Sequence, residues 1–223
     1  MMTNKNIVIT IDGPAGAGKS TVAKKIASKL GIIYLDTGAM YRAVTYKLLE
    51  TNTDFENPSK LDELLKTINL TYKEGALCLD GKKVGDEIRT PIINQHVSKV
   101  SSNAAVRDAM TNLQREIGKK QSCIMDGRDI GTVVFPNAEV KIFLVADVEK
   151  RAQRRYLENQ QHGIISSLEE IKESIVLRDK LDSEREIAPL LKAVDAIEID
   201  TSDIGIDDVV SKIINIYMEK TNV

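Results

Sequence analysis

The chain has little cysteine: only Cys78 and Cys123 occur among its 223 residues. Two cysteines this far apart form neither a disulfide framework nor the spacing of a metal site, a usage that suits a reducing compartment. No apolar run approaches the roughly 18 residues that span a bilayer. The opening stretch MMTNKN also lacks the apolar segment of a signal peptide. We therefore expect a cytoplasmic protein that has no membrane partner.

An excess of one charge sign is also missing. Lysine and arginine number 31, aspartate and glutamate 33, and the net charge is −2. A chain without a global basic field gives no reason to expect a nucleic-acid partner. A length of 223 residues fits one large domain, or a core domain with a smaller insertion. We expect a monomer.

Short apolar runs alternate with helical patterns along most of the chain. The spacing of apolar residues predicts helices over 20–30, 39–49 and 207–218. Strands are predicted at 7–11, 32–35, 122–126, 140–145 and 196–200. This alternation predicts an α/β fold, with a five-stranded parallel sheet and helices on both faces.

Two segments depart from the alternation. In the first, alternating residues over 70–84 and the turn Asp80-Gly81 predict a small antiparallel meander. Thr90-Pro91 then suits the start of a helical region that runs to about residue 120 with a break near Ser101-Ser102. The second, 149–187, is helical and rich in charge, with a capping box beginning at Ser167. The predicted division is core 1–58, insertion 59–98, core 99–148, lid 149–165 and core 166–223.

The segment Gly13-Pro14-Ala15-Gly16-Ala17-Gly18-Lys19-Ser20 fits the P-loop pattern G-x-x-x-x-G-K-[ST] between a predicted strand and a predicted helix. Its glycines let backbone N–H groups surround phosphate oxygens, and the helix N-terminus adds positive partial charge. Lys19 reaches the β- and γ-phosphates, and the Ser20 hydroxyl suits Mg²⁺. We expect ATP at Gly13–Ser20 and Thr21, with Mg²⁺ at Ser20.

A P-loop alone leaves the reaction open. Switch GTPases need a guanine-reading N-K-x-D element, which the sequence does not contain. The predicted strand 122–126 leads into Asp126-Gly127-Arg128-Asp129, so two carboxylates and a guanidinium lie at the end of a strand. A surface cluster of ion pairs is one interpretation. Together with the basic segment that follows, the pattern favours transfer of phosphate to a second bound anion.

Four blocks together resemble the bacterial cytidylate kinase family. They are 13–20, D-T-G-A-M-Y-R at 36–42, D-G-R-D-I-G-T-V-V at 126–134, and R-x-x-x-D-x-x-R at 178–185. The resemblance covers essentially the whole chain, including the meander. It implies a P-loop NTPase-type core, an NMP-binding insertion and a helical lid, with Mg²⁺-dependent transfer of the ATP γ-phosphate to CMP or dCMP. Alternatives are another small-molecule or NMP kinase (UMP/CMP, adenylate or shikimate type) and a nucleotide-binding regulator without turnover.

The resemblance also implies roles for individual residues. Arg42 and Arg128 would hold the CMP phosphate, and Arg185 would bridge toward the phosphates. Cytosine would be read by Asp129, with Ser98 and Arg107. The ribose hydroxyls would meet Asp182 and Arg178. The catalytic residues implied are Lys19, Arg42, Arg128, Arg178 and Arg185.

Four further implied positions are less specific. Thr37 would lie close to the transferring group, and it also suits the N-cap of its helix. Asp36 would orient a metal-bound water, and Asp126 would belong to the substrate site. One lid arginine, Arg154 or Arg155, would close over ATP.

Overall fold

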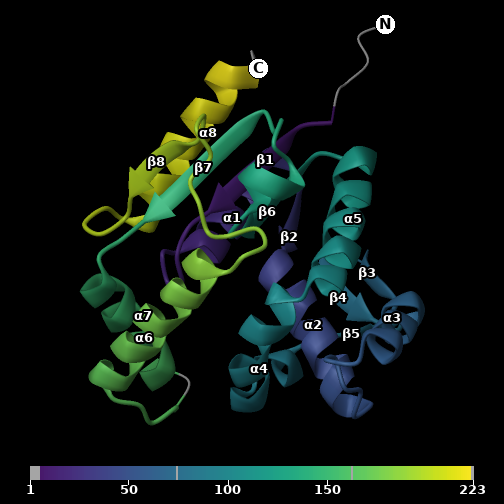
Figure 1. The fold of residues 1–223 in the computed structure, drawn as a ribbon. Coiled ribbons are helices and arrows are strands. Elements are labelled where there is room, and N and C mark those ends of the chain that lie inside the picture. Colours follow the sequence, from purple (N-terminus) through teal and green to yellow (C-terminus); the bar gives the residue numbers. More distant parts are fainter. Residues whose placement is uncertain (1–5, 74, 162, 222–223) are drawn as a thin grey trace, which may run out of the picture.

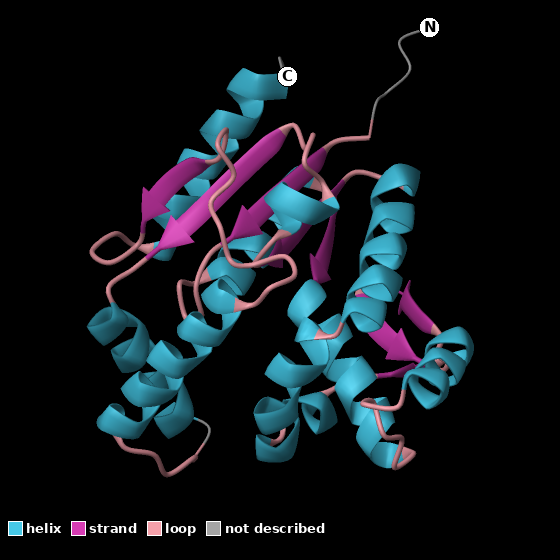
Figure 2. Ribbon diagram, in the orientation of Figure 1, coloured by secondary structure: helices cyan, strands magenta, loops and turns pink. Residues whose placement is uncertain are grey.

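A parallel sheet runs through the centre of the computed structural model, which describes residues 6–73, 75–161 and 163–221 (Figures 1 and 2). Its five strands lie in the order β2-β6-β1-β7-β8. They are β1 (Val8–Asp12), β2 (Ile33–Asp36), β6 (Cys123–Gly127), β7 (Val140–Val145) and β8 (Ile197–Asp200). All neighbours in this sheet are parallel. The predicted α/β fold is therefore confirmed.

Helices cover both faces of the sheet. Helices α1 (Lys19–Leu30) and α8 (Ile206–Thr221) share a buried cluster with Ile9 and Ile11 of β1. On the other face, Val8 packs with the π-helical turn η2 (Ile130–Val134), and α5 (Ala104–Lys120) lies beyond it. All of β1 is buried, as expected of a strand covered on both faces. No helix in the described ranges has both the length and the apolarity of a membrane span.

A second core lies beside the sheet and contains the predicted meander. Strands β3 (Leu70–Lys73), β4 (Ala76–Leu79) and β5 (Lys82–Lys83) form an antiparallel sheet. It packs with α2 (Thr37–Glu50), α3 (Pro58–Thr67) and α4 (Pro91–Ser102). The Asp80-Gly81 turn has φ values of 50° and 82°, as a tight hairpin requires. The predicted helix break falls at Asn103, whose side chain caps α5.

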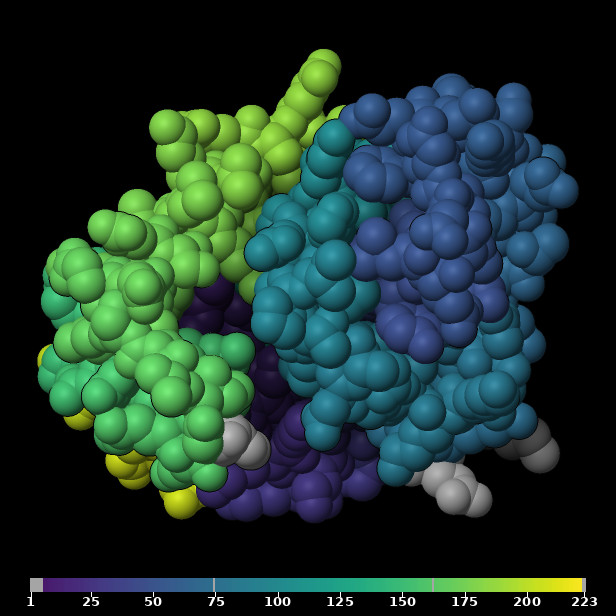
Figure 3. Space-filling model, turned by 90° about the horizontal axis from the view of Figure 1, so that it is seen from below, coloured from purple at the N-terminus to yellow at the C-terminus, as the bar shows by residue number. Residues whose placement is uncertain are grey.

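Helices α6 (Val148–Gln161) and α7 (Leu168–Glu184) form a hairpin that leaves the core. A small cluster of Ala152, Ile171 and Ile175 holds the two helices together. The capping box of Ser167 and Glu170 is confirmed at the start of α7. Figure 3 shows a hollow between this hairpin and the side that carries α4, with N-terminal residues at its floor.

The predicted N-cap of α2 is wrong by one residue. Asp36 caps this helix, because its Oδ1 accepts from the Ala39 N–H at 2.8 Å. Thr37 is the first helical residue, and its hydroxyl donates to the Asp126 carbonyl at 2.7 Å. Thr90 does precede Pro91 at the start of α4, but its side chain makes no capping hydrogen bond.

Gly13 joins β1 to the P-loop at a position that has no room for a side chain. It has φ +145°, and a Cβ there would lie 2.1 Å from the Leu144 carbonyl oxygen. We expect Gly13→Ala to lower the free energy of unfolding by about 3 kcal/mol or more, the upper end for overpacking, because a backbone oxygen cannot rotate away. Urea denaturation measures this. The control Gly31→Ala, at φ +66° with nothing within 4 Å, should cost about 1 kcal/mol. Equal losses in the two variants would contradict the steric argument.

Candidate functional site

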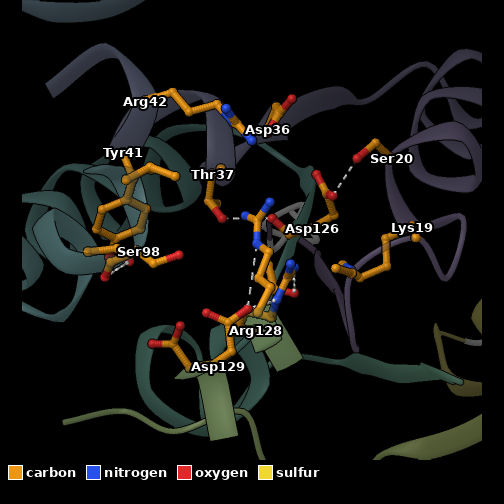
Figure 4. A pocket seen from close by; sticks show the side chains of 18 of the residues that line it. Lys19, Ser20, Asp36, Thr37, Tyr41, Arg42, Ser98, Asp126, Arg128 and Asp129 are labelled. Atoms are coloured by element: carbon orange, nitrogen blue, oxygen red, sulfur yellow. Dashed lines mark hydrogen bonds and ion pairs between the residues drawn. The ribbon is translucent and has the colours of Figure 1, made fainter. Parts of the chain in front are cut away.

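Three neighbouring strands carry an acidic residue at the last or next-to-last position, at one edge of the sheet. Strand β1 ends at Asp12, opposite Gly127, and β2 ends at Asp36, opposite Asp126. Ligands of open α/β sheets bind at this carboxyl edge, where the strand order reverses. A pocket lies there and is drawn from close by in Figure 4.

Residues from all four sequence blocks line this pocket. The predicted residues that it brings together are Ala15, Gly16, Lys19, Ser20, Asp36, Thr37, Arg42, Ser98, Arg107, Asp126, Arg128, Asp129, Arg178, Asp182 and Arg185. The predicted residues outside its lining are Gly13, Pro14, Ala17, Gly18, Thr21, Arg154 and Arg155.

Neither of the two predicted lid arginines lines the pocket, although the charge of Arg155 contributes to lowering the pKa of the lining residues Arg42 and Arg178. Arg154 donates to the backbone oxygens of Thr201 and Ser202, beyond β8. Arg155 is exposed and pairs with Glu158 at 3.0 Å. Their contact with ATP stays a prediction.

The P-loop folds over the side chain of Lys19. Gly16 and Gly18 have φ values of 77° and 86°, the left-handed region that favours glycine. Lys19 is 6% exposed, and its Nζ donates to the Pro14 carbonyl at 2.7 Å. Burial lowers the pKa of Lys19, and the neighbouring Arg128 lowers it further. A bound anion beside this ammonium would raise the pKa of Lys19 again, because it favours the charged form.

Asp126 connects the P-loop to β2 and α2. Its carboxylate accepts from Ser20 Oγ at 2.7 Å and from the Tyr34 hydroxyl at 2.8 Å, and Thr37 holds its backbone oxygen. Burial raises the pKa of Asp126, and the charge of Asp36 acts in the same direction. Two carboxylates and a hydroxyl therefore lie together beside the P-loop.

Asp129 lies at the opposite end of the pocket from the P-loop lysine (Figure 4). It is 4% exposed and pairs with both Arg107 and Arg185, the latter at 3.1 Å. The Arg107 guanidinium also lies 5.5 Å from the centroid of the Tyr41 ring, a cation–π distance. Asp129 is thus a buried carboxylate fixed by two cations.

Arg128 and Arg178 also line the pocket, and the charge of each lowers the pKa of Lys19. Arg128 Nε donates to Asp182 Oδ2 at 2.7 Å. Arg178 Nε is 4.0 Å from the same oxygen and has no hydrogen-bond partner within the described ranges. Burial lowers the pKa of Arg178 to about 10, and Arg128 adds to this effect. Burial likewise lowers the pKa of Arg42 to about 10. Crowded, desolvated guanidinium groups make this pocket suited to anions.

Comparison with known proteins identifies the family. The cytidylate kinase family model matches residues 9–219. The chain belongs to the cytidylate kinase family. It is 52% identical over 217 residues to a cytidylate kinase of Bacillus cereus (strain B4264), covering 96% of each chain. A cytidylate kinase of Bacillus anthracis (strain CDC 684 / NRRL 3495) is 51% identical over 219 residues, covering 96% of this chain and 97% of that one.

Solved structures with little sequence identity share the fold alone. An uncharacterized protein from Eubacterium ventriosum has a TM-score of 0.55 at 16% identity, covering 96% of this chain and 99% of that one. A shikimate kinase from Bacteroides thetaiotaomicron has a TM-score of 0.50 at 12% identity, covering 97% and 99%. The predicted P-loop kinase architecture of this cytidylate kinase family member is thereby supported.

Sequence reasoning missed several residues of the pocket. Arg89, at the end of the 3₁₀ helix η1 (Asp86–Arg89), reaches from the insertion to Asp36 Oδ2 at 3.1 Å. Tyr41 and Ser101 also line the pocket and were missed, although Tyr41 lies within the second sequence block. Tyr34 was missed as well; it lies outside the lining and donates to Asp126. An arginine before a helix or a tyrosine in a strand carries no spacing signal, because only the folded chain brings it to the pocket.

Asp12 holds the turn that follows Asp129. Its carboxylate accepts from the N–H groups of Ile130 and Gly131 at 2.9 and 2.7 Å. A Cβ at Gly131 would lie 2.9 Å from Thr10 Oγ1, so glycine allows this close approach. Burial raises the pKa of Asp12 to about 6, against the opposing effect of the two N–H groups.

This raised pKa predicts a specific pH dependence of stability. Between pH 4 and 6 the folded state keeps the Asp12 proton that the unfolded state releases, so stability falls as pH rises through this window. The amide introduced by Asp12→Asn does not titrate. The free energy of unfolding of the wild type minus that of Asp12→Asn should therefore fall by about 2.4 kcal/mol from pH 4 to 7. Urea denaturation across this range measures it, and a difference independent of pH would contradict the raised pKa.

Proposed function

We propose that the protein transfers the γ-phosphate of ATP to CMP or dCMP, giving ADP and CDP or dCDP. The observation that carries this proposal is one pocket lined by the P-loop lysine together with several arginines, among them Arg42, Arg128 and Arg178. A second phosphate needs such cations, whereas a sensor that only binds ATP does not. Membership of the cytidylate kinase family supports the same reaction.

The proposed mechanism relies on positioning and charge neutralisation, which phosphoryl transfer mainly needs. The P-loop and Lys19 hold ATP, and Arg42 and Arg128 hold the acceptor phosphate in line with it. Arg128 exchanges Asp182 for this phosphate, which leaves the Asp182 carboxylate available to the ribose hydroxyls. The Nε of Arg178, which has no hydrogen-bond partner in the described ranges, is suited to donate to the same phosphate. The acceptor phosphate is already anionic, so no general base is needed.

Magnesium fits the oxygen groups beside the P-loop. Mg²⁺ prefers one or two carboxylates together with substrate phosphates. Ser20 and Asp126 offer a hydroxyl and a buried carboxylate, and the nearby charge of Asp36 raises the pKa of Asp126. A cation there would relieve the repulsion. When bound, Mg²⁺ would neutralise charge on the transferring phosphate; Ser20 would hold it, with the carboxylates of Asp36 and Asp126 close by.

The proposal includes the division of the chain. Segment 59–98 is the NMP-binding insertion and 149–165 the lid, while 1–58, 99–148 and 166–223 form the core. The hollow in Figure 3 supports this division, because it separates the hairpin from the α4 side. We expect a cytoplasmic monomer whose partners are ATP and CMP or dCMP, with no nucleic-acid or membrane partner.

A coupled assay of ATP consumption tests the reaction. ATP consumption should require an added acceptor. It should be fast with CMP or dCMP and much slower with AMP or shikimate. Lys19→Met should lower kcat by about 10²–10³-fold, since its charge serves the transition state. The control Lys29→Met, at an exposed position of α1, should leave kcat unchanged. ATP binding without CMP-dependent turnover would favour a regulator instead.

Base choice gives a sharper test. We infer that Asp129 accepts from the cytosine amino group, because a carboxylate has lone pairs left after two arginine bonds. Asp129→Asn should shrink the CMP:UMP ratio of kcat/KM by about 5- to 150-fold. The exposed control Asp108→Asn, beside Arg107 in sequence, should keep the ratio. An unchanged ratio in a folded Asp129→Asn variant would assign base reading to Ser98 and Arg107.

A further inference from the structure

Two side chains of the α6–α7 hairpin enclose one residue of the P-loop. Asp179 Oδ1 accepts from the Ala15 N–H at 2.9 Å, and Arg151 Nη1 donates to the Ala15 carbonyl at 2.9 Å. Arg151 and Asp179 also pair with each other. Arg151 is 8% exposed, and its Nε donates to the Ala146 carbonyl at 2.8 Å. Both backbone polar groups of Ala15 are therefore held from outside the loop.

These contacts orient two consecutive peptide groups. In a planar trans peptide, the C=O and the N–H point in opposite directions. Asp179 holds the N–H of the Pro14–Ala15 peptide, and the C=O of that peptide accepts from Lys19 Nζ at 2.7 Å. Arg151 holds the C=O of the next peptide, which turns the Gly16 N–H to the opposite side. Gly16 and Lys19 both line the pocket.

The packing around Ala15 is close enough to transmit a change at the hairpin. A Cβ at Gly16 would lie 3.2 Å from Arg151 Cβ, so α6 rests directly on the loop. Left-handed glycines would otherwise leave the loop many conformations. The hairpin helices are joined by the cluster around Ile171, so Arg151 and Asp179 move together with them.

We propose that Arg151 and Asp179 are a positioning pair for ATP. The pair orients the Gly16 N–H and the Lys19 ammonium toward the triphosphate, so that the phosphate-binding loop is complete only with the base of the α6–α7 hairpin docked on it. This inference depends on the proposed function in one respect only, which is that CMP is taken as the acceptor. ATP binding to the P-loop is tested without that acceptor.

Calorimetric titration of ATP in the absence of CMP tests the pair without turnover. Asp179→Asn removes the ion pair and sets an amide donor against the guanidinium. Arg151→Lys keeps the charge but loses the fork that reaches Ala15, Ala146 and Asp179 together. Each variant should raise the Kd for ATP by about 10-fold or more and leave the Kd for CMP within about twofold. Glu173→Gln, an exposed control on α7, should change neither.

Two further measurements separate positioning from general support. The Kd for ATP of the double variant Arg151→Lys/Asp179→Asn should not exceed that of the single variant that binds ATP more weakly, because the two side chains act as a unit. At saturating ATP and CMP, kcat should also fall, by about 10²-fold, because Lys19 is displaced.

An unchanged Kd for ATP in both single variants would overturn the proposal. Equal weakening of ATP and CMP with a lowered Tm would overturn it too, by making the pair a support of the whole fold. If CMP proves not to be the acceptor, the titrations of ATP alone still test whether Arg151 and Asp179 position the P-loop.

Discussion

The buried carboxylate of Asp126 is the contact on which both halves of the site depend. Burying a carboxylate is costly unless its oxygens are hydrogen-bonded, and Ser20 and Tyr34 supply those bonds. Thr37 binds the backbone oxygen of the same residue. The P-loop helix, β2 and α2 are thereby held to β6 in one arrangement. Arg128 follows two residues after Asp126, so the same contact sets its position relative to the P-loop.

Beyond that contact, the pocket is organised by charges that pair with one another. Asp129 pairs with both Arg107 and Arg185, and Asp182 pairs with Arg128. Such desolvated ion pairs contribute little to the net stability of the fold, but they fix the orientation of the side chains that form them. Burial lowers the pKa of Arg178 to about 10, which still leaves its guanidinium protonated at neutral pH. Positive charge therefore exceeds what the local carboxylates satisfy, and this excess favours an anionic ligand.

The comparison of sequence with structure shows where local pattern was sufficient. Strand and helix periodicity predicted the parallel sheet, and Asp80-Gly81 predicted the meander turn, because both depend on neighbours in the chain. The N-cap of α2 was misassigned to Thr37 because a buried hydroxyl bonds to Asp126 instead of its own helix. Arg89 and Asp12 carried no pattern, since their partners lie more than fifty residues away in the first case and over a hundred in the second.

By itself, the sequence determined the fold class, the P-loop and the identity of most side chains that line the pocket. Those features depend on periodicity, on glycine spacing and on residue types that occur together in short blocks. Only the tertiary structure decided which charges meet: Arg128 with Asp182, Asp129 with two arginines, and Arg151 with Asp179 beside Ala15. Several arginines and aspartates could pair in many ways. The geometry of packed helices and the cost of leaving a buried charge unpaired select one of them.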